Sequence, residues 1–360
     1  FPMQNNPSVV LRGTKDIVFE NRPVPHLKDP HYVKIAIKET GICGSDFAYY
    51  ATGACGSFKM EKPMVLGHES SGVITEVGSA VKTLKVGDRV ACEPGVPSRY
   101  SYEYKSGHYN LCPYMAFAAT PPYDGTLCRY YVLPEDFCVK LPDTVSFEEG
   151  ALVEPLSVAV HANRRAEVHC GDRLLVMGAG PVGLFIAGVG RAFGAMKVII
   201  VDRVQPRLEF AVKNGFATDY YNSDNKSTED LAKYINQKWD GESPTVAIDA
   251  TGAPVCIRTA LQVICKGGRY VQVGNGKTTL DKFPIARISE NEINVRGSFR
   301  YGVNDYKTAV GLIATKKINV KPLITHRFSF EHAAEAYEFF TQHKAIKIII
   351  SGPSSLKSKL

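Results

Sequence analysis

The sequence predicts an α/β protein in two parts, a small β-barrel followed by a doubly wound parallel sheet with helices on both faces. Residues 8–155 combine short strands with turns, which is typical of a barrel. From about Gly171 near-continuous apolar strands alternate with helical stretches, the pattern of a parallel sheet that is buried on both faces. A length of 360 residues also suits two domains.

The barrel prediction depends on three segments of the first part. Residues 32–37 alternate between polar and apolar side chains, as a half-buried strand does. Residues 72–77 and 85–90 give a strand, a glycine turn and a second strand. Residues 95–123 are rich in Pro, Tyr, Ser and Gly, so we expect a long surface loop there.

The parallel sheet is predicted from four apolar strands at residues 173–177, 197–201, 245–249 and 269–273. A helix is expected after the first strand, at residues 181–193. The expected domains are residues 1–157, residues 158–297, and a last segment, 298–360, that returns to the first domain. There is no low-complexity tract and no repeat beyond the strand–helix alternation.

Composition and charge exclude several classes of protein. The net charge is +7, but the basic residues are spread along the chain without a run of five like charges, so a nucleic-acid surface is disfavoured. Nine scattered cysteines without a Cys-x-x-Cys pair suit a reducing compartment rather than a disulfide framework. No apolar run reaches the ~18 residues of a membrane span, so no membrane insertion is expected.

The sequence ends with Ser358-Lys359-Leu360, the tripeptide of a peroxisomal address that an import receptor reads. We therefore expect a peroxisomal protein that binds this receptor, and leakage to the cytoplasm is the alternative.

A glycine-rich loop lies between the first apolar strand and its helix. Gly178 permits a tight turn, Gly180 lets backbone amides approach a pyrophosphate, and Gly183 lets the helix pack against the strand. The positive end of the helix dipole would stabilise the phosphates. The alternative is a glycine turn that binds no ligand, but the surrounding strand and helix make a dinucleotide site the better interpretation.

An acidic residue follows this loop at the expected distance. Asp202 ends the next strand, about 20 residues on, and would accept hydrogen bonds from the adenosine ribose hydroxyls. Its charge would repel a 2′-phosphate, which favours NAD over NADP. The neighbouring Arg203 complicates this prediction, because an arginine there can bind that phosphate.

Four further residues offer metal ligands. Cys43 follows a turn, His68 and Glu69 open a strand, and Glu154 lies near the domain junction. One thiolate, one imidazole and two carboxylates are ligand types that Zn²⁺ accepts. Each has an ordinary structural explanation when taken alone, and only their combination with the dinucleotide site indicates redox chemistry on an alcohol or carbonyl.

The chain resembles the zinc-dependent medium-chain dehydrogenases over nearly its whole length, above all the sorbitol and xylitol dehydrogenases of yeasts. The matching motifs are Gly-Ile-Cys-Gly-Ser-Asp at 41–46, Gly-His-Glu at 67–69, Ala-Ala-Thr-Pro-Pro-Tyr-Asp-Gly at 118–125, Leu-Val-Glu-Pro-Leu-Ser at 152–157, the glycine loop, and Phe-Arg-Tyr at 299–301. The resemblance implies a GroES-like β-barrel domain, a Rossmann domain, and a homo-tetramer or homo-dimer.

The resemblance also implies residue roles. Cys43, His68 and Glu69 would bind the catalytic zinc with a water, and Glu154 would either bind the zinc directly or hold that water. Ser45 and Glu154 would form the proton path, and the substrate would contact Tyr49, Phe117, Thr120, Glu154, Arg300 and Tyr301. The NAD contacts would be Gly178, Gly180, Val182, Gly183, Asp202, Arg207, Val273, Gly274, Asn275, Ser298, Phe299 and Arg300.

The chain departs from the family pattern at two places. Many relatives bind a structural zinc with four cysteines, but here those positions hold Ser98, Ser101, Tyr104 and Cys112, so one zinc per chain is expected. Ala48 stands where relatives usually carry a histidine, which puts a proton-relay or substrate role of that side chain in doubt.

These observations favour a zinc-dependent enzyme that oxidises a polyol of the xylitol, sorbitol or arabinitol type to the ketose, with hydride transfer to NAD. A dehydrogenase for another secondary alcohol or a diol is the nearest alternative. A non-catalytic NAD(P)H-binding protein is a further alternative, but such relatives usually lack the zinc ligands that this chain keeps.

Overall fold

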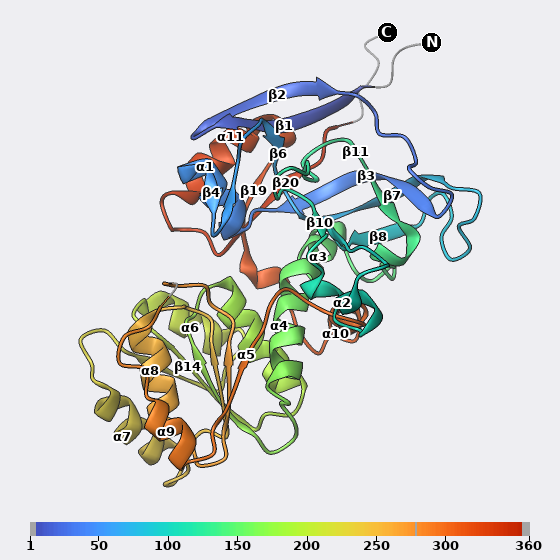
Figure 1. Cartoon of the computed structure of the whole chain (residues 1–360). Coiled ribbons are helices and arrows are strands. Elements are labelled where there is room, and N and C mark those ends of the chain that lie inside the picture. Colours follow the sequence, from blue (N-terminus) through green and yellow to red (C-terminus); the bar gives the residue numbers. More distant parts are fainter. Residues whose placement is uncertain (1–4, 278, 355–360) are drawn as a thin grey trace. The chain divides into compact units, whose positions relative to one another are not determined.

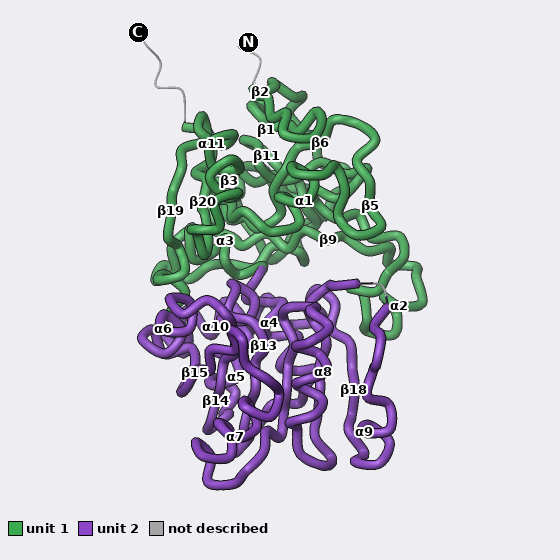
Figure 2. The backbone as a smooth tube through the Cα atoms, turned by 90° about the vertical axis from the view of Figure 1, so that its left-hand side faces the viewer, with its two compact units in different colours: residues 1–154, 319–360 green, residues 155–318 purple. Residues whose placement is uncertain are grey.

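The computed structural model describes residues 5–277 and 279–354. These residues form two compact units, one from residues 5–154 and 319–354 and one from the described residues of 155–318 (Figure 2). The tripeptide 358–360, predicted to be a peroxisomal address, lies outside the described residues. No helix in the described part of the chain is long and apolar enough to cross a membrane.

The first unit consists mainly of strands (Figure 1). Its largest sheet has the order β12-β8-β7-β3-β20-β19, and β11 pairs with β3. The strands of this sheet are β3 (Tyr32–Gly41), β7 (Glu69–Val77), β8 (Arg89–Cys92), β11 (Tyr130–Pro134), β12 (Cys138–Lys140), β19 (Ile324–Phe328) and β20 (Lys347–Ser351). The last two strands come from the segment after Ile318, which belongs to this unit.

Smaller elements complete the first unit. A second sheet has the order β2-β1-β6, and two strand pairs, β4 with β5 and β9 with β10, lie outside both sheets. Their bounds are β1 (Asn6–Gly13), β2 (Asp16–Arg22), β4 (Ala54–Cys55), β5 (Phe58–Lys59), β6 (Met64–Val65), β9 (Gly95–Val96) and β10 (Ala116–Phe117). The helices are α1 (Gly44–Thr52), α2 (Tyr102–Lys105), α3 (Phe147–Ala151) and α11 (Ala333–Phe340), with short 3-10 turns at Tyr109–Leu111, Glu135–Phe137, Lys321–Leu323 and Phe330–His332.

The segment 95–123, expected to be one long loop, contains short elements. Helix α2 forms there because Ser101 caps its first turn, with the side chain accepting a hydrogen bond from the Tyr104 amide at 3.2 Å. Arg99 ties this lobe together by donating to the Tyr104 hydroxyl (3.0 Å) and to Asp136 (2.8 Å). The Cys112 sulfur accepts a hydrogen bond from the Ser98 amide at 3.3 Å.

The second unit is a parallel sheet with the strand order β15-β14-β13-β16-β17-β18. In chain order this reads 3-2-1-4-5-6, the arrangement of a doubly wound dinucleotide-binding sheet. The strands are β13 (Arg173–Met177), β14 (Lys197–Asp202), β15 (Asp219–Asn222), β16 (Val246–Asp249), β17 (Arg269–Gln272) and β18 (Asn294–Gly297). The predicted parallel sheet is therefore confirmed.

Helices cover both faces of this sheet. The helices of the unit are α4 (Val153–Arg165), α5 (Pro181–Ala192), α6 (Gln205–Lys213), α7 (Thr228–Lys238), α8 (Pro254–Val263), α9 (Ile285–Glu290) and α10 (Asp305–Ala314). Leu175 and Ile199 belong to a core that includes Leu231 of α7 and Leu261 of α8. Leu174 points to the opposite face, where it lies against Gly190 of α5.

The second unit ends at Ile318, which differs from the predicted boundary at residue 297. Helix α10 belongs to this unit because Asp305 at its start ties it to α4. The buried Asp305 carboxylate accepts hydrogen bonds from His161 (2.8 Å), from Arg164 and from the Gly302 amide (2.5 Å). Ile318 also lies close to Gly188 of α5.

Candidate metal centre and dinucleotide site

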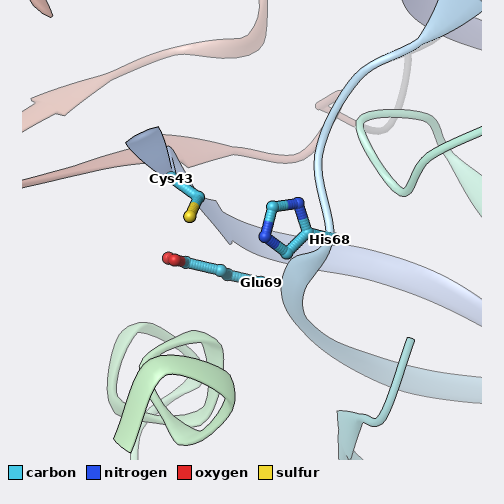
Figure 3. A group of neighbouring side chains, drawn as sticks. All are labelled: Cys43, His68 and Glu69. Carbon is cyan, nitrogen blue, oxygen red and sulfur yellow. The ribbon is translucent and has the colours of Figure 1, made fainter. Parts of the chain in front are cut away.

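Cys43, His68 and Glu69 come together in the first unit (Figure 3). One potential ligand atom from each of them lies within 4.8 Å of the other two. Glu69 and His68 are buried, and Cys43 is partly exposed. A sulfur, an imidazole nitrogen and a carboxylate oxygen fit a catalytic zinc, which takes three protein ligands and keeps a fourth position open.

The local sequence explains how each ligand is placed. Cys43 is the N-cap of α1, and Asp46 three residues later reaches back to the Cys43 amide (3.4 Å), so the cysteine is fixed at the start of the helix. Gly67 has φ +90°, which disfavours a side chain, and a Cβ there would crowd Leu127. The chain can therefore turn sharply just before His68 and enter β7 at Glu69.

Asp46 also orients His68, a role that the sequence reasoning did not assign to it. Its carboxylate, fully buried, lies 3.2 Å from His68 Nδ1. This leaves the other ring nitrogen for a metal, as in many carboxylate–histidine–metal arrangements. Burial alone would lower the pKa of His68, but Asp46 and the Cys43 side chain outweigh it and hold that pKa well above its usual value.

Lys347 is a second residue that the sequence reasoning missed. Its ammonium is buried against Glu69, donating to Oε1 at 2.5 Å and also to Oε2, and it donates to the Ile42 carbonyl at 3.1 Å. Burial would lower the pKa of Lys347, but Glu69 and Cys43 reverse that effect and raise it. The available signal was a lysine within the apolar run 345–350, because a buried charge needs a partner.

Glu154 lies outside the group of three ligands. It is buried on the first turn of α4, and its charge contributes to the raised pKa of Lys347. Ser45, the other predicted proton-path residue, lies on the first turn of α1 and is partly exposed. Both catalytic roles stay predictions.

Three predicted substrate residues lie beside the ligands. The Phe117 and His68 rings are 5.6 Å apart. Thr120 hydrogen-bonds to the buried Tyr49, whose pKa is raised to about 12 by burial and by nearby groups that include Cys55. Cys55 of β4 lies near the same group, because Cys43, Asp46 and His68 all influence its pKa, which burial chiefly raises.

Two other predicted substrate residues, Arg300 and Tyr301, belong to the second unit. The Arg300 guanidinium lies over the Phe299 ring at 4.7 Å, and the Tyr301 ring packs against Tyr306 at 5.1 Å. Arg300 has φ +54°, a left-handed conformation in which a non-glycine residue is uncommon. These residues follow β18 directly, so they lie at the carboxyl edge of the parallel sheet.

The glycine loop fits a dinucleotide. Gly178 has φ +100°, Gly180 is the N-cap of α5, and a Cβ at Gly183 would collide with the Gly178 carbonyl. Apart from its own loop and helix, a Cβ at Gly180 would meet no atom within 4 Å, so the backbone is open to a ligand there. Asp202 ends β14 and accepts hydrogen bonds from the Ala179 amide at 2.7 Å, which links it to this loop.

The remaining predicted NAD contacts lie near the carboxyl ends of the parallel strands of the second unit. Val273 and Gly274 follow β17, and both their amides donate to the Asp249 carbonyl at 2.9 Å. A Cβ at Gly274 would collide with Gly252, which in turn lies against Asn275. Ser298 follows β18, Val182 lies on the first turn of α5, and Arg207 is a partly exposed residue of α6.

Comparisons with known proteins agree with this arrangement. Residues 181–315 match the zinc-binding dehydrogenase family, and residues 29–143 match the alcohol dehydrogenase GroES-like domain. The chain is 55% identical to sorbitol dehydrogenase 1 of Saccharomyces cerevisiae over 354 residues, which cover 97% of this chain and 99% of that protein. It is 50% identical to D-xylulose reductase of Scheffersomyces stipitis, over 98% of this chain and 100% of that protein.

Solved structures show the same fold. L-idonate 5-dehydrogenase from Escherichia coli superimposes with a TM-score of 0.87 at 29% identity, covering 97% of this chain and 98% of that one. Galactitol-1-phosphate dehydrogenase from Escherichia coli superimposes with a TM-score of 0.86 at 28% identity, covering 96% of this chain and 99% of that one. The GroES-like domain and the Rossmann domain therefore agree with the comparisons, and the chain belongs to the zinc-binding dehydrogenase family.

Proposed function

We propose that this protein oxidises a polyol of the xylitol, sorbitol or arabinitol type to the corresponding ketose, with one zinc ion and NAD. The observation that carries the proposal is the convergence of Cys43, His68 and Glu69 in a chain that also has a dinucleotide loop. The sorbitol dehydrogenase and D-xylulose reductase relatives, at 50–55% identity, support the substrate class.

Each residue of the site has a separate part in the proposed reaction. A bound zinc would polarise the substrate oxygen as a Lewis acid, and NAD would accept the hydride. Asp46 keeps His68 oriented, and Lys347 holds the Glu69 carboxylate. The Glu154 carboxylate and the Ser45 hydroxyl would carry the alcohol proton away.

Selectivity for a polyol would come from groups that bind its additional hydroxyls. Tyr49 and Thr120 offer hydroxyl groups beside the metal ligands, and Phe117 offers an apolar wall. Arg300 and Tyr301 can donate hydrogen bonds as well. An unpaired polar group in a site built for hydroxyls is costly, so simple alcohols should be poor substrates.

The decisive experiment measures initial NADH production across a panel of polyols, diols and simple secondary alcohols, with zinc content determined on the same samples. Cys43→Ser should lose turnover and zinc but keep NADH binding. The matched control is Cys170→Ser, which removes an exposed thiol of the second unit. Turnover by zinc-free Cys43→Ser protein would contradict the metal mechanism, and a preference for diols would favour the alternative substrate class.

We also propose one zinc per chain and a preference for NAD. The lobe around residues 98–112 is held by Arg99, Asp136 and backbone contacts without a four-cysteine set. Two tightly held zinc ions per chain would contradict this. Asp202→Ala should reduce the ratio of kcat/KM for NAD over NADP, and an unchanged ratio would show that Asp202 does not select the cofactor.

Two further proposals come from the sequence. Ser358-Lys359-Leu360 would direct the protein to peroxisomes, so a fluorescent fusion ending in this tripeptide should be punctate and removal of Leu360 should make it diffuse. A homo-tetramer or homo-dimer is proposed from the resemblance to polyol dehydrogenases. Sedimentation equilibrium that gives the 39.5 kDa mass of one chain would contradict it.

A further inference from the structure

Glu69 has a double role in the structure. One of its oxygens belongs to the metal-ligand group with Cys43 and His68, and the same carboxylate is paired with Lys347. Both side chains are almost fully buried, with side-chain exposures of 4% for Lys347 and 1% for Glu69. A buried carboxylate without a positive partner is strongly unfavourable, so Lys347 balances the charge of Glu69 when no metal does.

The sheet explains how two distant residues meet. Strand β3 lies between β7 and β20, and Gly41 of β3 is paired with Glu69 on one side and with Ile349 on the other. A Cβ at Gly41 would collide with Glu69 Oε2. Because Gly41 has no side chain, the Glu69 carboxylate can extend across β3 to the ammonium of Lys347, two residues before Ile349.

We propose that Lys347 is a positioning residue that holds Glu69 in place and competes with the metal ion for its carboxylate, so that the site stays folded without metal and can exchange it. This inference rests on the proposed zinc site. With metal bound, two positive groups share one carboxylate, so Lys347 contributes less. Without metal, Lys347 alone neutralises Glu69, so its contribution is largest.

The test compares Lys347→Met with the wild-type protein, each loaded with zinc and each stripped by a chelator. Lys347→Met should lower the unfolding midpoint more in the stripped protein than in the loaded one. Zinc affinity, measured by competition with a colorimetric chelator, should rise about tenfold or more, the scale of close charge-pair couplings. Lys347→Arg should restore wild-type behaviour in both measurements.

Lys34→Met is the matched control. Lys34 is a lysine of β3 in the same sheet, its side chain is 11% exposed, and it is paired at 2.5 Å with Glu76 of β7, away from the metal ligands. Its loss should lower the midpoints of loaded and stripped protein equally and leave zinc affinity unchanged. Because the Glu76 side chain is 50% exposed, this control separates competition for the metal from the general loss of a largely buried lysine charge.

The outcomes distinguish this inference from the proposed function. If Lys347→Met lowers both midpoints equally, or if zinc affinity is unchanged or falls, the inference is overturned while the zinc enzyme stands. If Lys347→Met does not fold, the double variant Lys347→Met with Glu69→Gln, which removes both charges, should fold in the stripped state. If that double variant does not fold, the inference is overturned. If the wild-type protein binds no zinc, both the inference and the proposed function are contradicted.

Discussion

Replacing Asp305 by alanine should destabilise the second unit and weaken substrate binding. The Asp305 carboxylate is 1% exposed and accepts from His161, Arg164 and the Gly302 amide. Loss of one partner from a buried charge network costs about 3–5 kcal/mol. His161 and Arg164 are partly exposed and can turn to water, so we expect a cost near the lower limit, about 3 kcal/mol.

The same carboxylate fixes the segment that carries Arg300. Arg300 and Asn304 both have left-handed backbones, at φ +54° and +66°. Such conformations cost of order 1 kcal/mol each and persist only when neighbouring contacts hold them. Without the bond from the Gly302 amide to Asp305, Arg300 should relax. Because Arg300 is one of the proposed substrate contacts, KM for the proposed polyol substrate should rise by about tenfold, equivalent to about 1.4 kcal/mol.

Thermal unfolding followed by circular dichroism measures the first effect. For a unit of this size, residues 155–318, about 3 kcal/mol lowers the midpoint by roughly 6–12 °C. Asp305→Asn should be milder because it keeps an acceptor for the Gly302 amide, and Asp224→Ala, at an exposed loop position, should change stability by less than about 0.5 kcal/mol. A fall of under about 2 °C for Asp305→Ala, below 1 kcal/mol on the same scale, would refute the reasoning.

Three other substitutions give further expectations. Burial raises the pKa of Glu39 from 4.5 to about 7, so the folded protein holds a proton that the unfolded chain releases. The free energy of unfolding should therefore fall as pH rises from about 4.5 to 7. In Glu39→Gln protein this fall, measured by urea unfolding, should be smaller by about 1–2 kcal/mol, a value reduced because Glu39 is partly exposed to solvent. Arg99→Met should remove the contact with Asp136 and speed tryptic cleavage after the exposed Lys105, with a cost of about 1 kcal/mol. Gly183→Ala should push α5 from the glycine loop, lower stability by about 1–3 kcal/mol, and weaken NADH binding in a fluorescence titration.

Each of these expectations has a clear contrary result. An identical dependence of stability on pH in wild-type and Glu39→Gln protein would show that Glu39 ionises normally. Unchanged tryptic cleavage in Arg99→Met would show that other contacts hold the lobe. Normal NADH affinity in Gly183→Ala would show that the tight helix–strand approach is not needed for the cofactor.

The glycine loop and the metal ligands could be predicted from the sequence because their signals are local. Gly178 and Gly183 are constrained by steric effects within a few residues, and Cys43 is held by Asp46 in the same turn. Each motif is short enough to be recognised in the sequence, although the metal ligands gain their meaning only in combination with the dinucleotide loop.

Features that depend on distant contacts could not be predicted in the same way. Lys347 acts on Glu69 across 278 positions of sequence, and only the strand order β7-β3-β20 brings them together. The end of the second unit at Ile318 depends on Asp305 binding to α4. The left-handed Arg300 has no propensity signal, since arginine rarely adopts that conformation.

The strand order also has a consequence for synthesis of the chain. Strands β19 and β20 complete the largest sheet of the first unit, and they follow the whole second unit in sequence. Domains generally fold as units during translation, the N-terminal one first. Here the continuous second unit leaves the ribosome complete while the first still lacks its last strands. Lys347 is therefore synthesised long after Cys43, His68 and Glu69, and a metal ion bound before that point would meet these ligands without the positive charge that Glu69 faces in the finished protein.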